Sequence, residues 1–106
     1  MATGILGSND LSGATNTTVY TAPADTYAVV SLNLCNRGNQ AVALRVAVAA
    51  ADTPTAAEYI EYDVEILAKG VLERTGIVLD AGKKLVCYSS AANVSAVAMG
   101  IETPTV

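Results

Sequence analysis

Apolar residues recur at every second position through most of this sequence, and this period restricts the fold more than any other feature. In AVALRVAVAA (residues 41–50), one side of an extended chain carries Val42, Leu44, Val46 and Val48. Successive side chains of a strand point to opposite faces. The pattern therefore predicts a β-strand with one buried face.

The same signal recurs along the chain at intervals of about ten residues. The predicted strands are 17–22, 27–35, 41–50, 59–66, 71–79, 85–88 and 94–101. No segment carries helical spacing over three turns. The sequence predicts an all-β fold of seven to eight strands with little helix, built as an antiparallel β-sandwich or jelly roll. The short connections favour hairpins between consecutive strands, with residues 36–40 as one hairpin loop, and they leave the strand order open.

The first sixteen residues, MATGILGSNDLSGATN, lack this alternation and are rich in Gly, Ser, Thr and Asn. Such composition is typical of irregular segments. We therefore expect residues 1–16 to form an N-terminal arm that orders on docking to a partner, and residues 17–106 to form a single sandwich domain.

Composition excludes several classes of function. Apolar residues make up 52% of the chain, charged residues 15%, and His is absent. Without His the chain lacks the commonest general base and metal ligand, and no nucleophile–base pair is visible. We therefore expect neither an enzyme nor a protein that holds a cofactor or a metal ion.

The charge pattern and hydropathy bear on possible partners. The net charge is −4 and the six basic residues are scattered, so nucleic acid is not an expected partner. No charged leader and no run of 18 apolar residues is present, which disfavours a secreted or membrane-spanning protein. Cys35 and Cys87 are expected to be small buried hydrophobes, with a single disulfide bridge as the alternative.

Residues 59–66, YIEYDVEI, carry a row of carboxylates. If Ile60, Tyr62, Val64 and Ile66 face inward, then Glu61, Asp63 and Glu65 project from the opposite face. Carboxylates spaced along a strand diverge and do not converge on one metal ion. The row is therefore predicted to face solvent or another subunit, with Arg45 and Arg74 as outward-facing partners on neighbouring strands.

Four short motifs resemble those of small β-domains in virion proteins of tailed bacteriophages, of the decoration, cement or tail accessory type. The motifs are Tyr20–Ala24, Cys35-Asn36, Tyr59–Asp63, and Ala92–Ser95 followed by Gly100 and Glu102. The resemblance covers residues 19–38 and 59–102. It implies a structural component of a virion, assembled in the cytoplasm of the bacterial host.

Within that resemblance, the first hypothesis is a capsid decoration or cement protein that stabilises the shell through subunit contacts. A tail, baseplate or fibre-attachment subunit is the second, and a carbohydrate-binding module is an alternative from another class. The expected partners are the major capsid protein or tail proteins and further copies of the chain, with a trimer as one option. Tyr is favoured at interface anchors. The candidate interface residues are Tyr59, Glu61, Tyr62, Asp63, Glu65, Arg45 and Arg74.

Overall fold

The computed structural model describes residues 2–105, which form eight strands and one short 3-10 helix. The strands are β1 (Thr3–Leu11), β2 (Thr15–Thr21), β3 (Thr26–Asn36), β4 (Val42–Ala49), β5 (Tyr59–Ile66), β6 (Val71–Leu79), β7 (Lys84–Ser89) and β8 (Val94–Pro104), and the helix is η1 (Ala56–Glu58). The predicted all-β class is confirmed, and each of the seven predicted segments coincides with a strand to within a few residues.

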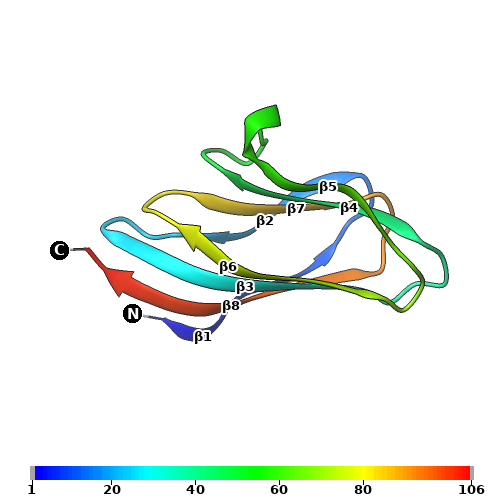
Figure 1. The fold of residues 1–106 in the computed structure, drawn as a ribbon, viewed down its shortest axis with the longest axis horizontal. Coiled ribbons are helices and arrows are strands. Elements are labelled where there is room, and N and C mark those ends of the chain that lie inside the picture. Colours follow the sequence, from blue (N-terminus) through cyan, green and yellow to red (C-terminus); the bar gives the residue numbers. More distant parts are fainter. Residues whose placement is uncertain (1, 106) are drawn as a thin grey trace.

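The strands form two four-stranded sheets that face each other as a sandwich (Figure 1). The strand orders are β1-β8-β3-β6 and β2-β7-β4-β5, and the pairs of neighbouring strands are antiparallel. Of the connections between consecutive strands, only β4–β5 stays within one sheet. This alternation of eight strands between two sheets is the arrangement of a jelly roll.

The prediction of hairpins between consecutive strands is therefore wrong for most of the chain. Residues 37–41 lead from β3 in one sheet to β4 in the other. A connection of five residues can span about 10 Å between sheets as well as about 4.8 Å between neighbouring strands. Its length and turn residues do not distinguish the two cases.

The hydrophobic core lies between the sheets and is aliphatic. The residues predicted to face inward on 41–50 do so: Val42, Leu44 and Val46 are buried, and Val48 packs against them. From β3, Val30, Leu32 and Leu34 are buried. Further large buried side chains are Leu11, Leu79, Leu85 and Val94. Every second side chain of each central strand thus points into the core, and the side chains between them form the outer faces.

The prediction of an irregular arm at residues 1–16 is wrong for residues 3–11, which form β1. This strand pairs with β8 from Thr3 opposite Ile101 to Leu11 opposite Val94. Leu11 is buried and Leu6 packs against the core. A bulge between Ile5 and Gly7 interrupts the alternation, and this irregularity conceals the strand in the sequence. The sandwich therefore begins at residue 3 and not at residue 17.

The two sheets approach closely where β1 meets β2. A Cβ atom placed on Gly7 would lie 2.1 Å from the carbonyl oxygen of Val19. Only glycine, which has no Cβ, permits this contact. The β2 strand is itself bulged between Thr18 and Tyr20. The two bulges thus lie at one corner and close that side of the sandwich.

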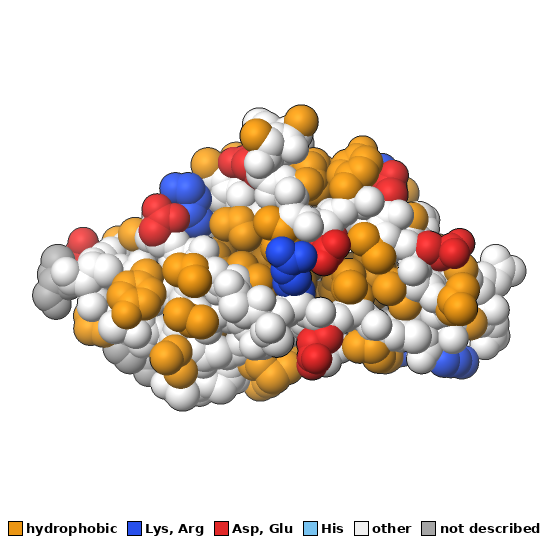
Figure 2. All heavy atoms as spheres, in the orientation of Figure 1, with side chains coloured by type: hydrophobic (Ala, Val, Ile, Leu, Met, Phe, Trp, Pro, Cys, Tyr) orange, Lys and Arg blue, Asp and Glu red, His pale blue; other side chains and the backbone are white. Residues whose placement is uncertain are grey.

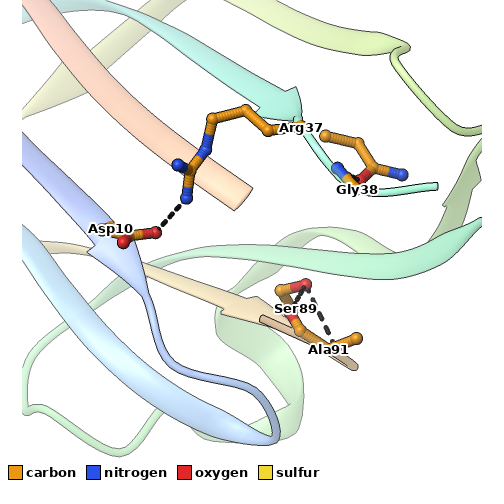
Figure 3. Close-up of polar contacts among 6 residues, drawn as sticks. Asp10, Arg37, Gly38, Ser89 and Ala91 are labelled. Atoms are coloured by element: carbon orange, nitrogen blue, oxygen red, sulfur yellow. Dashed lines mark hydrogen bonds and ion pairs between the residues drawn. The ribbon is translucent and has the colours of Figure 1, made fainter. Parts of the chain in front are cut away.

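A buried asparagine ties together the loops at one end of the sandwich. The side-chain amide nitrogen of Asn36 lies 2.8 Å from the carbonyl oxygen of Gln40 and 3.2–3.3 Å from those of Ile66 and Leu67. Its oxygen accepts a hydrogen bond from the Gly38 amide. In the same region Arg37 reaches Asp10 of β1, and the Ser89 hydroxyl bonds to Ala91 (Figure 3). Asn36 thus joins the β3–β4 loop to the end of β5 and the turn that follows it.

The other end, where the chain termini lie, is held by a tyrosine and a carboxylate (Figure 1). The hydroxyl of Tyr20, a largely buried residue of β2, donates to Glu102 of β8 at 2.5 Å. Glu102 also accepts a hydrogen bond from the Ala2 amide. The Tyr20 hydrogen bond, followed by that of Ala2, lowers the pKa of Glu102. This bond therefore joins the two sheets and is strongest when Glu102 is ionised.

We predict that Tyr20→Phe destabilises the protein near neutral pH and that this loss shrinks in acid. A carboxylate whose pKa is lowered in the folded state contributes stability above its unfolded pKa and loses it as the pH falls through the folded value. The measurement is thermal unfolding of both proteins between pH 7 and pH 3. The difference in Tm between wild type and variant should decrease below about pH 4.5. A constant difference across this range would contradict the assignment.

Candidate functional site

Side chains that could bind a metal ion do not cluster in the described part of the chain. Within residues 2–105, no three His, Cys, Asp or Glu side chains lie close enough to hold a metal ion. Cys35 and Cys87 are both free thiols. Burial raises the pKa of Cys87 to about 12, so its thiol is protonated at neutral pH. No helix of residues 2–105 is long and apolar enough to cross a membrane.

The carboxylate row of β5 is broken by an irregularity in strand pairing. Val64 lies opposite Leu44, but Glu61, and not Tyr62, lies opposite Val46. The extra residue forms a bulge, and Asp63 has a positive φ of 53°. A shift of one residue moves the following side chains to the other face. Glu61 therefore faces the inner side of the sheet, and the prediction that Glu61, Asp63 and Glu65 share one outer face is wrong.

The bulge also turns Tyr62 outward, where it was predicted to face the core. Tyr62 is 57% exposed, and the guanidinium carbon of Arg45 lies 4.4 Å from its ring centroid. Arg45 lies equally close, at 4.5 Å, to the ring of Tyr88 on β7. The Tyr59 ring meets Tyr62 edge-on, with 4.9 Å between centroids. One guanidinium is thus held between two tyrosine rings on the outer face of the β2-β7-β4-β5 sheet.

Asp63 completes this group, because its carboxylate accepts a hydrogen bond from Nε of Arg45 at 2.6 Å. This bond raises the pKa of Arg45, a side chain that is charged at physiological pH in any case. The predicted cross-strand pairing of Arg45 with the acidic residues of β5 is confirmed for Asp63. We call Arg45, Tyr59, Tyr62, Asp63 and Tyr88 the tyrosine–arginine cluster.

The loop between β4 and β5 covers the outer face next to this cluster (Figure 1). Glu58 at the end of η1 accepts hydrogen bonds from the Thr55 and Ala50 amides. Asp52 accepts a hydrogen bond from the Thr18 hydroxyl at 2.6 Å. Ala47 is buried although it faces outward, because the loop lies over it. Ala56 of η1, with Tyr59 and Tyr62, lines an open hollow at the edge of the cluster.

The second predicted arginine, Arg74, joins the two sheets. It lies opposite buried Leu32 in the pairing of β3 and β6, so it faces the inner side and not outward as predicted. Its guanidinium contacts the Glu61 carboxylate at 2.7 Å. This contact crosses from β6 to β5 at the edge opposite Gly7, and Figure 2 shows basic and acidic side chains side by side near the middle of that edge. The pair is a structural link between the sheets.

The structure thus separates the predicted interface residues into two groups. Arg45, Tyr59, Tyr62 and Asp63 come together on one outer face, whereas Glu61 and Arg74 pair at the edge of the sandwich. Glu65 is exposed near the C-terminal end of β5, away from Tyr59 and Tyr62. Sequence reasoning did not identify Tyr88 as part of this group. In the sequence it is marked only by its position between Cys87 and Ser89. Both of these are buried, so Tyr88 points outward, and the pairing of β7 with β4 places it opposite Arg45.

Comparison of the chain with known protein families, with curated proteins and with solved structures finds no match. The fold and the side-chain arrangement therefore carry the functional interpretation.

We predict that stacking, more than charge, holds the tyrosine–arginine cluster together. Arg45→Lys keeps the positive charge beside Asp63 but removes the planar group that packs on two rings, and it should lower Tm at low salt and in 0.5 M NaCl alike. Asp63→Asn removes only the ion pair, and its smaller effect should disappear at high salt because exposed ion pairs are screened. Thermal unfolding of both variants at the two salt concentrations measures this. Equal salt sensitivity of the two variants would contradict a stacking role.

Proposed function

We propose that this protein is a non-enzymatic structural component of a bacteriophage virion, and that it acts as a capsid decoration protein. It docks on the major capsid protein and stabilises the shell, because a ligand that binds one state shifts the equilibrium toward that state. Assembly in the host cytoplasm and a place on the finished virion follow from this role.

The observation that carries the proposal is the tyrosine–arginine cluster. Tyr and Arg are the residue types most enriched among the energetically dominant residues of protein interfaces. Here Arg45 is already oriented by two rings and a carboxylate, and the cluster lies on paired strands of a sandwich. A preorganised surface loses little conformational entropy on binding. This surface is therefore suited to docking on a protein partner.

Motif resemblance and fold class support the same proposal. The four motifs that resemble those of phage virion domains lie on, or directly next to, β2, β3, β5 and β8. Jelly rolls occur in viral capsid proteins and also in lectins, so the fold alone does not assign a function. With the same surfaces, the chain would also serve as a tail, baseplate or fibre-attachment subunit, which is the second candidate.

A carbohydrate-binding module is less well supported by the geometry of the rings. Sugar platforms need an accessible aromatic face on which a sugar ring can lie. In this protein Arg45 covers a face of both Tyr62 and Tyr88, and the Tyr59 and Tyr62 rings are inclined at 81°. The rings therefore contact one another and the guanidinium in place of forming a flat platform.

The proposal predicts saturable binding to phage heads. Labelled protein is mixed separately with heads stripped of accessory proteins and with isolated tails of the phage that encodes it, and bound copies are counted after sedimentation. We expect saturation on heads at hundreds of copies, and a loss of affinity of at least about tenfold for Tyr62→Ala, because truncating an energetically dominant interface residue costs about 2 kcal/mol or more.

The matched control is Leu67→Ala, since Leu67 is also a large exposed apolar residue but lies in the β5–β6 turn away from the cluster. Both variants are checked for folding by circular dichroism. Binding of a few copies to tails alone would select the second candidate. Binding to neither particle, or equal binding of wild type and Tyr62→Ala, would contradict the proposed docking surface.

A further inference from the structure

The outer face of the β1-β8-β3-β6 sheet carries most of the exposed large hydrophobic side chains of the described residues. Eight large hydrophobic side chains are exposed in residues 2–105, and six of them project from this one face. They are Ile5, Tyr27, Val29, Val71, Val78 and Ile101. We call this surface the apolar face. In Figure 2, hydrophobic side chains gather at the lower left, over β3, β6 and β8, with no acidic or basic side chain among them.

Strand register makes this surface continuous. Val29 on β3 lies directly opposite Val78 on β6 and Ile101 on β8. In the next outward row, Met99 lies opposite both Ser31 and Ile5. Directly opposite side chains are about 5 Å apart, so Val78, Val29 and Ile101 form one apolar row across three strands, and Met99 and Ile5 extend it onto β1. A contiguous exposed patch of this kind marks a binding surface more often than scattered apolar residues do.

Charge at the apolar face excludes several kinds of partner. The charged residues among its outward positions are Glu73, on the edge strand β6, and Asp10, which is paired with Arg37 at the loop end. A surface for nucleic acid or lipid headgroups needs clustered Lys and Arg, and a surface for a basic protein needs clustered carboxylates. The outward positions of β3 and β8, at the centre of the apolar face, carry neither basic nor acidic side chains. The surface that binds the apolar face must therefore be neutral and apolar.

We propose that the apolar face binds the same face of a second copy of this chain. A twofold contact places identical patches on each other, so a patch without charge near its centre is self-complementary. Four strands of nine to eleven residues, spaced about 4.8 Å apart with about 3.3 Å per residue, make a face of roughly 20 by 33 Å. Because side chains make the surface uneven, the accessible area of such a face is larger than this flat area and approaches the roughly 800 Å² that each partner buries in a stable interface.

Association by faces is favoured over association by strand edges. The edge strand β1 is bulged between Ile5 and Gly7, and Gly4 has a positive φ. The edge strand β6 is irregular opposite Val30 and Leu32, with Gly76 at a φ of 71°. Bulges displace the backbone groups that a second chain would pair with. The side chains of the central strands, in contrast, remain in regular register.

The inference goes beyond the proposed function, because it concerns the isolated protein and is tested without any virus particle. Light scattering coupled to gel filtration, and sedimentation equilibrium, give the mass of the purified protein in solution. We expect a mass of at least twice the 10.8 kDa of one chain at micromolar concentration. Val29→Glu and Ile101→Glu should each raise the dissociation constant at least about tenfold, because each would bury an unpaired charge at the interface.

Two further variants keep the test decisive. Leu67→Glu adds the same charge at an exposed apolar residue outside the apolar face and should leave the mass unchanged. If the substitutions on the central strands prevent folding, Ile5→Glu on β1 replaces them, since Ile5 is 63% exposed. A monomeric wild type at 0.5 mM would overturn the inference. So would an oligomer that survives folded Val29→Glu and Ile101→Glu, since its contacts would then lie elsewhere.

Discussion

Packing of short aliphatic side chains between the two sheets is the constraint on which the rest of this structure depends. The core contains neither Phe nor Trp, and its largest fully buried side chains are Leu residues such as Leu32, Leu44 and Leu85. Such side chains fill the space between sheets when every second residue of each strand points inward. Leu44 and Val46 therefore orient Arg45 outward, and Val30 and Ala28 do the same for Val29. Both outer surfaces follow from the core.

This dependence explains what could be predicted from the sequence. In 41–50 and 27–35 the apolar residues alternate without interruption, so the inward and outward sides of 41–50 were identified correctly, although the outward-facing Ala47 is also buried. In β1 the pattern is interrupted by the bulge at Ile5 and Gly7, and Leu11 is its only fully buried side chain. The strand is held largely by pairing with β8, which lies more than 80 residues away in the sequence. Pairing of this kind leaves no local signal.

The same limit applies to the candidate site. Alternation alone placed Glu61 outward and Tyr62 inward, and the bulge that reverses both arises from the register of β5 against β4. Asp63, which takes the positive φ at the bulge, is a residue type that tolerates that conformation, but Asp is too common for this to be predictive. Tyr88 joins the cluster because β7 pairs with β4 on the other side. The cluster is therefore a product of three strands and appears only once the sheet is assembled.

The two outer faces differ in how far their side chains are covered or paired within one chain. On the β2-β7-β4-β5 sheet, Arg45 has two rings and a carboxylate, and the β4–β5 loop covers Ala47. On the opposite sheet, Val29 lies between Val78 and Ile101, and all three side chains remain exposed. A pair of chains joined through the apolar faces would carry its two tyrosine–arginine clusters on opposite sides. Such a pair cannot place both clusters on one flat surface, so under the proposed function each cluster would contact a different neighbour.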